Sequence, residues 1–294
     1  MEGSDHVPGA AVVSPPIRIW HQSITELERL PSYAEALREH AAAVCGPDVT
    51  VDVHGVAPGT YPEGVAPIRT TCYPWAHQLL CDQIVLAAIE AERAGYDAVA
   101  CSCFLDPALR EARSVVDIPV VSALETSLTE SSVVAGPVGM LGLGGAMAAD
   151  MLVLARGYGL ADRIAAMVPV TPELTEHELD DPANHATVVE RVRRAGRTAI
   201  AAGAELLIPG EGMLNTLLAR RGVTEIDGVP VLDAFGLVVH HAEMFVRLRR
   251  ATELRTSRQG RYAKPPDSLR RHLTAATARA FTAETAVETR GAQP

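Results

Sequence analysis

The chain has 294 residues, of which 48% are hydrophobic and only 4% aromatic, and its formal net charge is −10. This length suffices for two modest α/β units with a substantial core, and the abundant Ala, Val and Leu suit helices packed on parallel strands. The acidic balance and the lack of a basic run argue against nucleic acid as a partner, and no apolar stretch approaches the roughly 20 residues of a membrane span.

The first part of the chain alternates between strand and helix patterns. Residues 1–16 contain Gly, Pro and Ser, lack the features of a secretory signal peptide and are predicted to form a disordered tail. The loop over 57–73 is long and rich in Pro, Gly and Thr, which is typical of a lid over a functional site. Strands are predicted over 17–20, 49–56, 98–101 and 118–121, and helices over 30–44, over 76–94 and from Asp106-Pro107 onward.

The second part repeats this alternation, with strands predicted over 138–143, 165–170, 206–208 and 231–233 and helices over 146–158, 182–202, 213–220 and 237–254. Such a pattern predicts an α/β fold with two pseudo-symmetric parallel-sheet lobes. The predicted first lobe comprises 17–122 and 232–256, and the second comprises 123–231. A C-terminal extension over 257–294 is expected to hold a peripheral helix around 269–281.

A weak internal repeat relates the two halves. One segment runs from Ala94-Gly95 to Cys103, and the other from Ala202-Gly203 to Glu211, with the same step from each glycine to its ionisable residue (95 to 103, and 203 to 211). A helical run precedes both segments and a Pro-Val strand follows both. Because ligands of such folds bind outside the carboxyl ends of the strands, we expect a site in the cleft between the halves, built around Cys103 and Glu211.

Cys103 lies between a buried strand and the predicted helix start at Asp106-Pro107. Orphan N–H groups and the helix dipole would favour a thiolate there, which could remove a proton or attack a carbonyl. The alternative is a buried small hydrophobe, because free cysteine is among the most buried residue types. Cys101 lies further back in the strand and is interpreted as core.

The five cysteines do not form the pattern of a disulfide framework. Their number is odd, their spacing is uneven, and Cys101-Ser102-Cys103 is a lone C-x-C without a second ligand pair at metal spacing. We therefore expect reduced thiols, no metal site and a cytoplasmic protein.

Glu211 stands in the segment Pro209-Gly210-Glu211-Gly212-Met213, at a predicted junction of strand and helix. A carboxylate flanked by glycines there is suited to face a crevice, where it could act as a general base or acid. The alternative is a helix N-terminal charge with a purely stabilising effect. Gly212 and Asn215 are candidate substrate-binding residues beside it, although a capping or surface role for Asn215 is equally open.

Further candidates for substrate binding follow other predicted strands. Gly144 and Gly145 could offer backbone N–H groups to a carboxylate or oxyanion. Their segment is not a dinucleotide fingerprint, because Met147 stands where the third glycine is needed, and the chain has no phosphate-binding loop. Gln22 and Ser23 could bind a substrate carboxylate or amide, or cap the next helix.

Together these residues resemble the aspartate/glutamate/hydantoin racemase superfamily over roughly residues 17 to 250. The segment Cys103-Phe104-Leu105-Asp106-Pro107-Ala108-Leu109 is similar to that family's Cys-Phe-x-Asp-Pro-Gly-Leu motif. The segment Pro209 to Met213 corresponds to its Leu-Gly-Cys-x-Gly-Met motif, with Glu211 in place of the second catalytic cysteine. The resemblance implies flavodoxin-like lobes, an active site in the cleft between them and catalysis without a cofactor.

In that family, two cysteines face the substrate carbon from opposite sides, one removing a proton and the other returning one. The resemblance thus implies a racemase, epimerase or isomerase that acts on a small carboxylate or cyclic amide, with Cys103 and Glu211 as the acid–base pair. A decarboxylase or C–C lyase of the same superfamily is the first alternative. A small-ligand binding protein without turnover is the second. A homo-oligomer is possible in each case.

Overall fold

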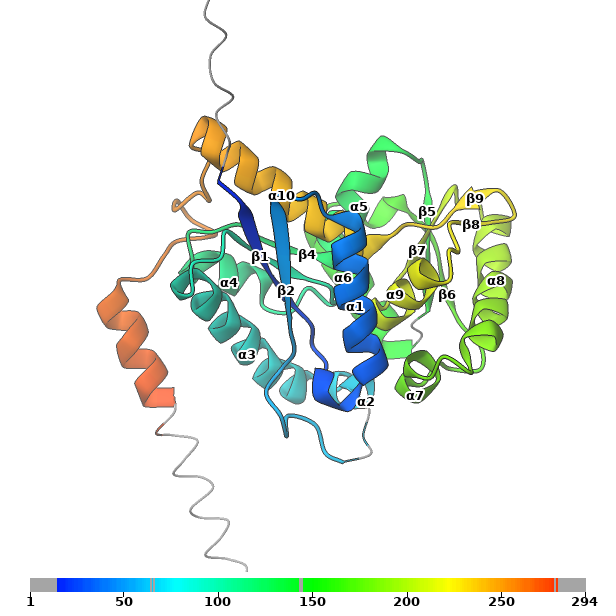
Figure 1. The fold of residues 1–294 in the computed structure, drawn as a ribbon, viewed down its shortest axis with the longest axis horizontal. Coiled ribbons are helices and arrows are strands. Elements are labelled where there is room, and N and C mark those ends of the chain that lie inside the picture. Colours follow the sequence, from blue (N-terminus) through cyan, green and yellow to red (C-terminus); the bar gives the residue numbers. More distant parts are fainter. Residues whose placement is uncertain (1–14, 64, 66, 143–144, 278, 280–294) are drawn as a thin grey trace, which may run out of the picture.

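Two separate parallel sheets form the centre of the computed structural model, which describes residues 15–63, 65, 67–142, 145–277 and 279 (Figure 1). The first sheet has the strand order β2-β1-β3-β4, and the second has the order β6-β5-β7. These strands are β1 (Ile17–Gln22), β2 (Val49–His54), β3 (Ala98–Cys101), β4 (Val120–Ser122), β5 (Val138–Gly142), β6 (Ile164–Pro169) and β7 (Leu206–Pro209). The predicted α/β fold with two parallel-sheet lobes is confirmed.

The two sheets share one topology. In the first lobe β1 lies between β2 and β3, and in the second lobe β5 lies between β6 and β7. The fourth position of the first sheet belongs to β4. In the second sheet Val231 occupies this position as a single parallel bridge to Leu207, so the strand expected over 231–233 is wrong. Directly before Val231 the chain forms a short antiparallel hairpin from β8 (Glu225–Ile226) and β9 (Val229–Pro230).

The central strands are apolar because helices cover both faces of each sheet. Every residue of β3 (sequence AVAC), β5 (VGMLG) and β7 (LLIP) is buried. The α-helices are α1 (Pro31–Val44), α2 (Pro67–Thr71), α3 (Pro74–Arg93), α4 (Leu109–Val115), α5 (Ala123–Glu130), α6 (Gly145–Tyr158), α7 (Glu176–Asp180), α8 (His185–Ala201), α9 (Gly212–Arg220) and α10 (Ala234–Thr252). Short 3-10 turns cover Leu27–Arg29, Ser131–Val133 and Ala161–Arg163. None of the helices in the described residues is long and apolar enough to cross a membrane.

The last long helix returns to the first lobe. In Figure 1, α10 lies across the first sheet, and it contacts β1, β3, β4 and α5. The chain after it is anchored to Asp117, whose carboxylate accepts hydrogen bonds from Arg258 (2.6 Å) and Lys264 (2.5 Å). A helix follows over 267–277, near the expected position. The predicted disordered tail lies outside the described residues except for Pro15 and Pro16, as does the end of the chain beyond residue 279.

One predicted helix start differs from the structure, and one short helix was not predicted. The helix expected over 182–202 corresponds to α8, and α7 is a separate short helix before it that starts with a capping box of Thr175 and Glu178. The helix expected from Asp106-Pro107 starts only at Leu109. The backbone of Asp106 has a φ of 41°, and its carboxylate accepts hydrogen bonds from the N–H groups of Leu124 and Glu125, both at 2.9 Å. Asp106 therefore caps α5 rather than its own helix.

Candidate active site

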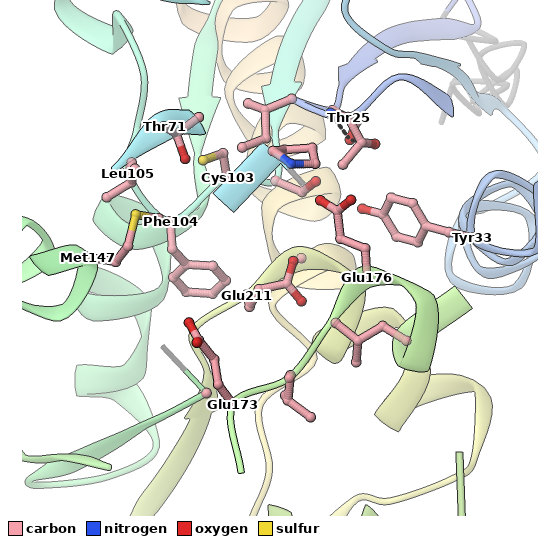
Figure 2. Close-up of a pocket in the computed structure, with 18 residues that line it drawn as sticks. Thr25, Tyr33, Thr71, Cys103, Phe104, Leu105, Met147, Glu173, Glu176 and Glu211 are labelled. Atoms are coloured by element: carbon pink, nitrogen blue, oxygen red, sulfur yellow. Dashed lines mark hydrogen bonds between the residues drawn. The ribbon is translucent and has the colours of Figure 1, made fainter. Parts of the chain in front are cut away.

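A cavity of about 80 Å³ lies where the strand ends of the two sheets face each other (Figure 2). From the first lobe it is lined by, among others, Ser23, Thr25, Tyr33, Ser102, Cys103 and Phe104. The second lobe contributes, among others, Gly142, Met147, Glu173, Glu176, Glu211 and Gly212. Cys103 and Glu211, the two residues related by the internal repeat, thus line one cavity.

Cys103 follows β3 and is 9% exposed. Burial raises the pKa of its thiol well above the usual range, and the nearby charges of Cys101, Asp106 and Glu211 add to the rise, while the Leu105 backbone N–H opposes it. The expected depressed pKa is therefore wrong. The physical reason is that α4 begins only at Leu109, so no helix N-terminus follows directly after the thiol. Cys103 is a protonated thiol at neutral pH, which suits it to deliver a proton.

Cys101 lies inside β3, is 3% exposed and packs in the hydrophobic core, as expected. Burial raises the pKa of its thiol to about 12.

Glu211 both lines the cavity and caps α9. One carboxylate oxygen accepts a hydrogen bond from the Met213 N–H at 3.1 Å, and the other accepts one from the Leu214 N–H at 2.6 Å. Burial raises the pKa of this carboxyl, and the two N–H groups oppose the rise. The two interpretations of Glu211 from the sequence are thus compatible, because the cap holds a carboxylate in place at the cavity wall.

Glu176 is a lining residue that the sequence analysis did not identify. It is the first residue of α7 and is half-buried. Burial raises the pKa of its carboxyl to about 7, and the charge of Glu211 adds to the rise, whereas Arg29 lowers it. The capping-box pattern Thr175-x-x-Glu178 could have revealed a helix start at this position.

Hydroxyl groups form the wall beside Glu211. The phenol of Tyr33 is 5% exposed and contacts the hydroxyls of Ser23 and Ser102. Burial raises its pKa, and the charge of Glu211 contributes. His21 holds the Ser102 hydroxyl through its Nε2 atom at 2.9 Å. Burial lowers the pKa of His21 to about 3, so this ring is neutral and the Tyr33 group stays a hydrogen-bond donor at neutral pH.

Steric crowding explains why the cavity-lining residue next to Glu211 is a glycine. A Cβ atom on Gly212 would lie 3.1 Å from the carbonyl oxygen of Ser102 and 3.3 Å from the hydroxyl of Tyr33, so a side chain would crowd this wall. Of the other predicted glycines, Gly145 begins α6 and Gly144 lies outside the described residues.

Two predicted binding residues do not line the cavity. Gln22 is 2% exposed; its side-chain oxygen accepts from Trp20 Nε1 at 2.9 Å, and its amide donates to the Ser23 carbonyl at 2.8 Å. The amide of Asn215 donates to the Leu232 carbonyl at 3.2 Å and accepts from the Phe235 N–H at 3.0 Å. Each side chain instead satisfies polar groups of the backbone or core around it. The neighbouring Ser23 does line the cavity.

The expected lid segment over 57–73 reaches the cavity through α2. Pro67 and Thr71 of this helix are lining residues. Between them, Arg69 donates to a carboxylate oxygen of Glu173 at 3.2 Å, which joins the segment to the loop that follows β6 in the other lobe. The segment therefore bridges the two lobes beside the cavity.

The charged side chains in the described lining of the cavity are all acidic. Three carboxyl groups contribute to it, from Glu173, Glu176 and Glu211, and no Lys, Arg or His is among the described residues that line it. No group of three or more His, Cys, Asp or Glu side chains that could hold a metal ion occurs in the described part of the chain either.

Comparison with known proteins points to one family. Residues 31–242 match the family model described as Asp/Glu/Hydantoin racemase. The hydantoin racemase of Paenarthrobacter aurescens is 29% identical over 174 residues, which cover 58% of this chain and 69% of that protein. A hydantoin racemase of Pseudomonas sp. (strain NS671) is also 29% identical, over 165 residues that cover 55% of this chain and 64% of that protein.

Solved structures share the fold. The allantoin racemase from Klebsiella pneumoniae superposes with a TM-score of 0.69 at 23% identity, covering 85% of this chain and 94% of that one. The allantoin racemase from Pseudomonas fluorescens gives a TM-score of 0.64 at 21% identity, covering 85% and 97% of the respective chains.

Proposed function

The chain belongs to the Asp/Glu/hydantoin racemase family, and we propose that it is a cofactor-independent racemase or epimerase of a small cyclic amide with a neutral ring. The relatives named as hydantoin and allantoin racemases support racemase activity and a ring substrate. The observation that carries the proposal is the pairing of one thiol and one carboxyl, from equivalent strand ends of two sheets, in an acidic cavity.

The acidic lining favours a cyclic amide over a carboxylate. A substrate carboxylate would meet the like charges of Glu173, Glu176 and Glu211, without a cationic side chain in the described lining to compensate. A hydantoin-like ring is neutral and offers both kinds of hydrogen-bonding group. Its N–H groups can donate to carboxylates, and its carbonyl oxygens can accept from hydroxyls such as that of Tyr33.

Proton removal is assigned to Glu211. As a carboxylate held by two backbone N–H groups, it takes the proton from the ring carbon next to a carbonyl. The electron pair of the broken C–H bond moves onto the carbonyl oxygen and gives an enolate. Hydroxyl groups in the lining, such as those of Tyr33 and Ser102, can donate to this oxygen.

Proton return is assigned to Cys103. Its S–H bond breaks as a new C–H bond forms on the opposite face of the same carbon, which inverts the configuration and leaves a thiolate facing a protonated Glu211. The raised pKa of the thiol keeps its proton in place at neutral pH, and an enolate is a strong enough base to take that proton. The reverse reaction starts from this second protonation state. The first state is restored when Glu211 releases its proton to water and the Cys103 thiolate takes up a proton from water.

Exchange in heavy water tests the proposal. An enantiopure 5-substituted hydantoin is incubated in D₂O near pH 7 with the enzyme, and optical rotation and the C5 proton signal are followed together, with an enzyme-free sample for the spontaneous rate. We expect loss of rotation and deuterium uptake at C5, both far above background. L-Aspartate and L-glutamate serve as carboxylate comparisons.

Three outcomes would contradict the proposal. Exchange with the amino acids but not with the hydantoin would assign a carboxylate substrate. Release of carbon dioxide from malonate-type acids without racemisation would favour the decarboxylase alternative. Ligand binding without exchange of any candidate would favour the binding-protein alternative.

A further inference from the structure

Glu176 stands at the junction of two hollows. It lines the inner cavity with Cys103 and Glu211, and it also lines an outer groove with Arg29, Tyr61 and others. The inner cavity measures about 80 Å³, a size that suits a small ring. The outer groove measures about 640 Å³. A substituent on a ring bound in the inner cavity would therefore leave it past Glu176.

The carboxyl of Glu176 has no hydrogen-bonded or ion-paired partner among the described residues. The two arginines that line the outer groove, Arg29 and Arg69, are engaged elsewhere. Arg29 lies 3.8 Å from the Glu26 carboxylate and donates to the carbonyls of Tyr61 and Pro62. Arg69 pairs with Glu173. Glu176 thus meets the charge of Glu211 without a bound counter-ion, and burial together with this repulsion raises its pKa to about 7.

Thr71 gives an independent indication that the inner cavity is built for a polar ligand. This side chain is 4% exposed and lines the cavity, yet its hydroxyl finds no hydrogen-bond partner in the part of the chain that the structure describes. Figure 2 shows it on the same side as Cys103. Because buried hydroxyls are nearly always hydrogen-bonded, a bound ring with a carbonyl or N–H group would complete this site.

We infer that the substrate carries a positively charged group, an ammonium or guanidinium, on its ring substituent and that Glu176 binds this group at the mouth of the inner cavity. The inference rests on the proposed racemisation of a cyclic amide. A cation at this point complements Glu176 and lies near Glu211, so it removes the repulsion between the two carboxylates. Tyr33 points toward Glu176 in Figure 2, so both side chains face the mouth of the inner cavity.

A matched set of hydantoins tests this inference. The 5-(4-aminobutyl) and 5-pentyl compounds have side chains of similar length and differ in charge, and the 5-(3-carboxypropyl) compound carries the opposite charge. The measured quantity is the ratio of kcat/KM between compounds, from racemisation in D₂O. We expect the aminobutyl compound to exceed the pentyl compound at least about tenfold, mainly through KM, and the carboxypropyl compound to be the poorest.

Variants of Glu176 separate recognition from folding. Glu176→Gln should reduce the ratio of aminobutyl to pentyl at least about tenfold. Glu176→Lys should invert the preference toward the carboxypropyl compound. Glu190→Gln, which removes an exposed carboxyl from α8, is the matched control and should keep the wild-type ratio. Thermal unfolding of each variant shows whether it is folded.

The outcomes distinguish this inference from the proposed function. Racemisation of the pentyl and aminobutyl compounds at equal kcat/KM would overturn the charged-substrate inference and leave the racemase proposal standing. An unchanged ratio in Glu176→Gln would overturn the role of Glu176. If none of the three hydantoins exchanges deuterium, the proposed function itself fails.

Discussion

Cys103 and Glu211 each stand two residues beyond the end of their strand, since β3 ends at Cys101 and β7 ends at Pro209. The two strands hold equivalent places in separate sheets, so the fold brings both side chains to one cavity. Their surroundings nevertheless differ. The Glu211 carboxylate receives two N–H groups from α9, whereas no helix starts next to the Cys103 thiol. The pair is therefore related by topology but not equal in chemistry.

The first prediction concerns Cys103. Cys103→Ser keeps a small polar side chain but replaces the thiol with a far weaker acid, and it should lower racemisation at least about a hundredfold. The measurement is kcat by polarimetry with an enantiopure hydantoin. Cys101→Ser is the control, because this side chain is in the core and does not line the cavity. Near-normal turnover of Cys103→Ser would remove the thiol from the mechanism.

The raised pKa of Glu176 predicts how stability depends on pH. A carboxyl whose pKa rises from 4.5 to about 7 on folding is protonated in both states below pH 4.5, and the folded state loses stability as the pH rises through about 7. Glu176→Gln cannot ionise. The thermal unfolding midpoint of this variant should thus be higher than that of the wild type, and the difference should be larger at pH 8 than at pH 4.5. Equal differences at both values would show that the pKa of Glu176 is not raised.

Asp106 should contribute to stability by joining elements of both lobes. Its carboxylate accepts hydrogen bonds from two N–H groups at the start of α5 and from the hydroxyl of Tyr158 on α6, at 2.8 Å. Asp106→Ala removes all three and also places alanine at a φ of 41°, so it should cost about 2–3 kcal/mol of unfolding free energy. Asp106→Asn tolerates this backbone and should cost less. Urea denaturation measures both, and a loss under about 0.5 kcal/mol for alanine would contradict the role.

The alternation of elements and the repeat around Cys103 and Glu211 are local patterns, and both survive in the structure. The sequence therefore predicts the two parallel sheets and most helices to within a few residues. It fails at Asp106-Pro107, a pattern that normally starts a helix. There the carboxylate serves α5, which is a contact between segments far apart in the chain. The strand expected over 231–233 fails likewise, because only Val231 pairs with Leu207 of β7 before α10 begins at Ala234.

The same distinction holds for the candidate site. Residues named for their position at a strand end, such as Ser23, Cys103 and Glu211, do line the cavity. The orientation of Gln22 and Asn215 depends on which neighbouring polar group each side chain satisfies, and this is not visible in sequence spacing. Glu176 was missed because its significance comes from burial beside Glu211, which only the packing of the second lobe on the first creates.

The segment over 57–73 is predicted to close further when a ligand binds and to help exclude water. Backbone amides in it should exchange more slowly with saturating hydantoin. Arg69→Ala removes the ion pair with Glu173. Because the side chains of Arg69 and Glu173 are 68% and 65% exposed, the free energy of unfolding should change by less than about 1 kcal/mol. The KM of this variant should nevertheless rise. Arg93→Ala, which removes an exposed pair on α3, is the control. Unchanged exchange in the ligand complex would contradict a lid.

A further prediction separates the two roles of Glu211. Glu211→Gln retains a side-chain oxygen that can accept from α9 but removes the base, so it should lower kcat at least about a hundredfold with a small change in stability. Glu211→Ala loses the cap as well and should cost about 1 kcal/mol more in unfolding free energy. Near-normal kcat in Glu211→Gln would make the carboxylate purely structural and leave a mechanism centred on Cys103.

The wild-type kinetics should also reveal that the pair is unequal. The free enantiomers of a hydantoin have equal free energy, so kcat/KM must be the same for both. In the proposed mechanism, however, the resting enzyme holds Glu211 as the carboxylate that accepts from two N–H groups and Cys103 as the thiol, a state that is ready for only one configuration. The kcat and KM values should therefore differ between enantiomers by the same factor. Glu211→Cys makes both groups thiols, so the kcat values for the two enantiomers should lie closer together in this variant. Identical kcat values for the two enantiomers in the wild type would contradict the asymmetric assignment.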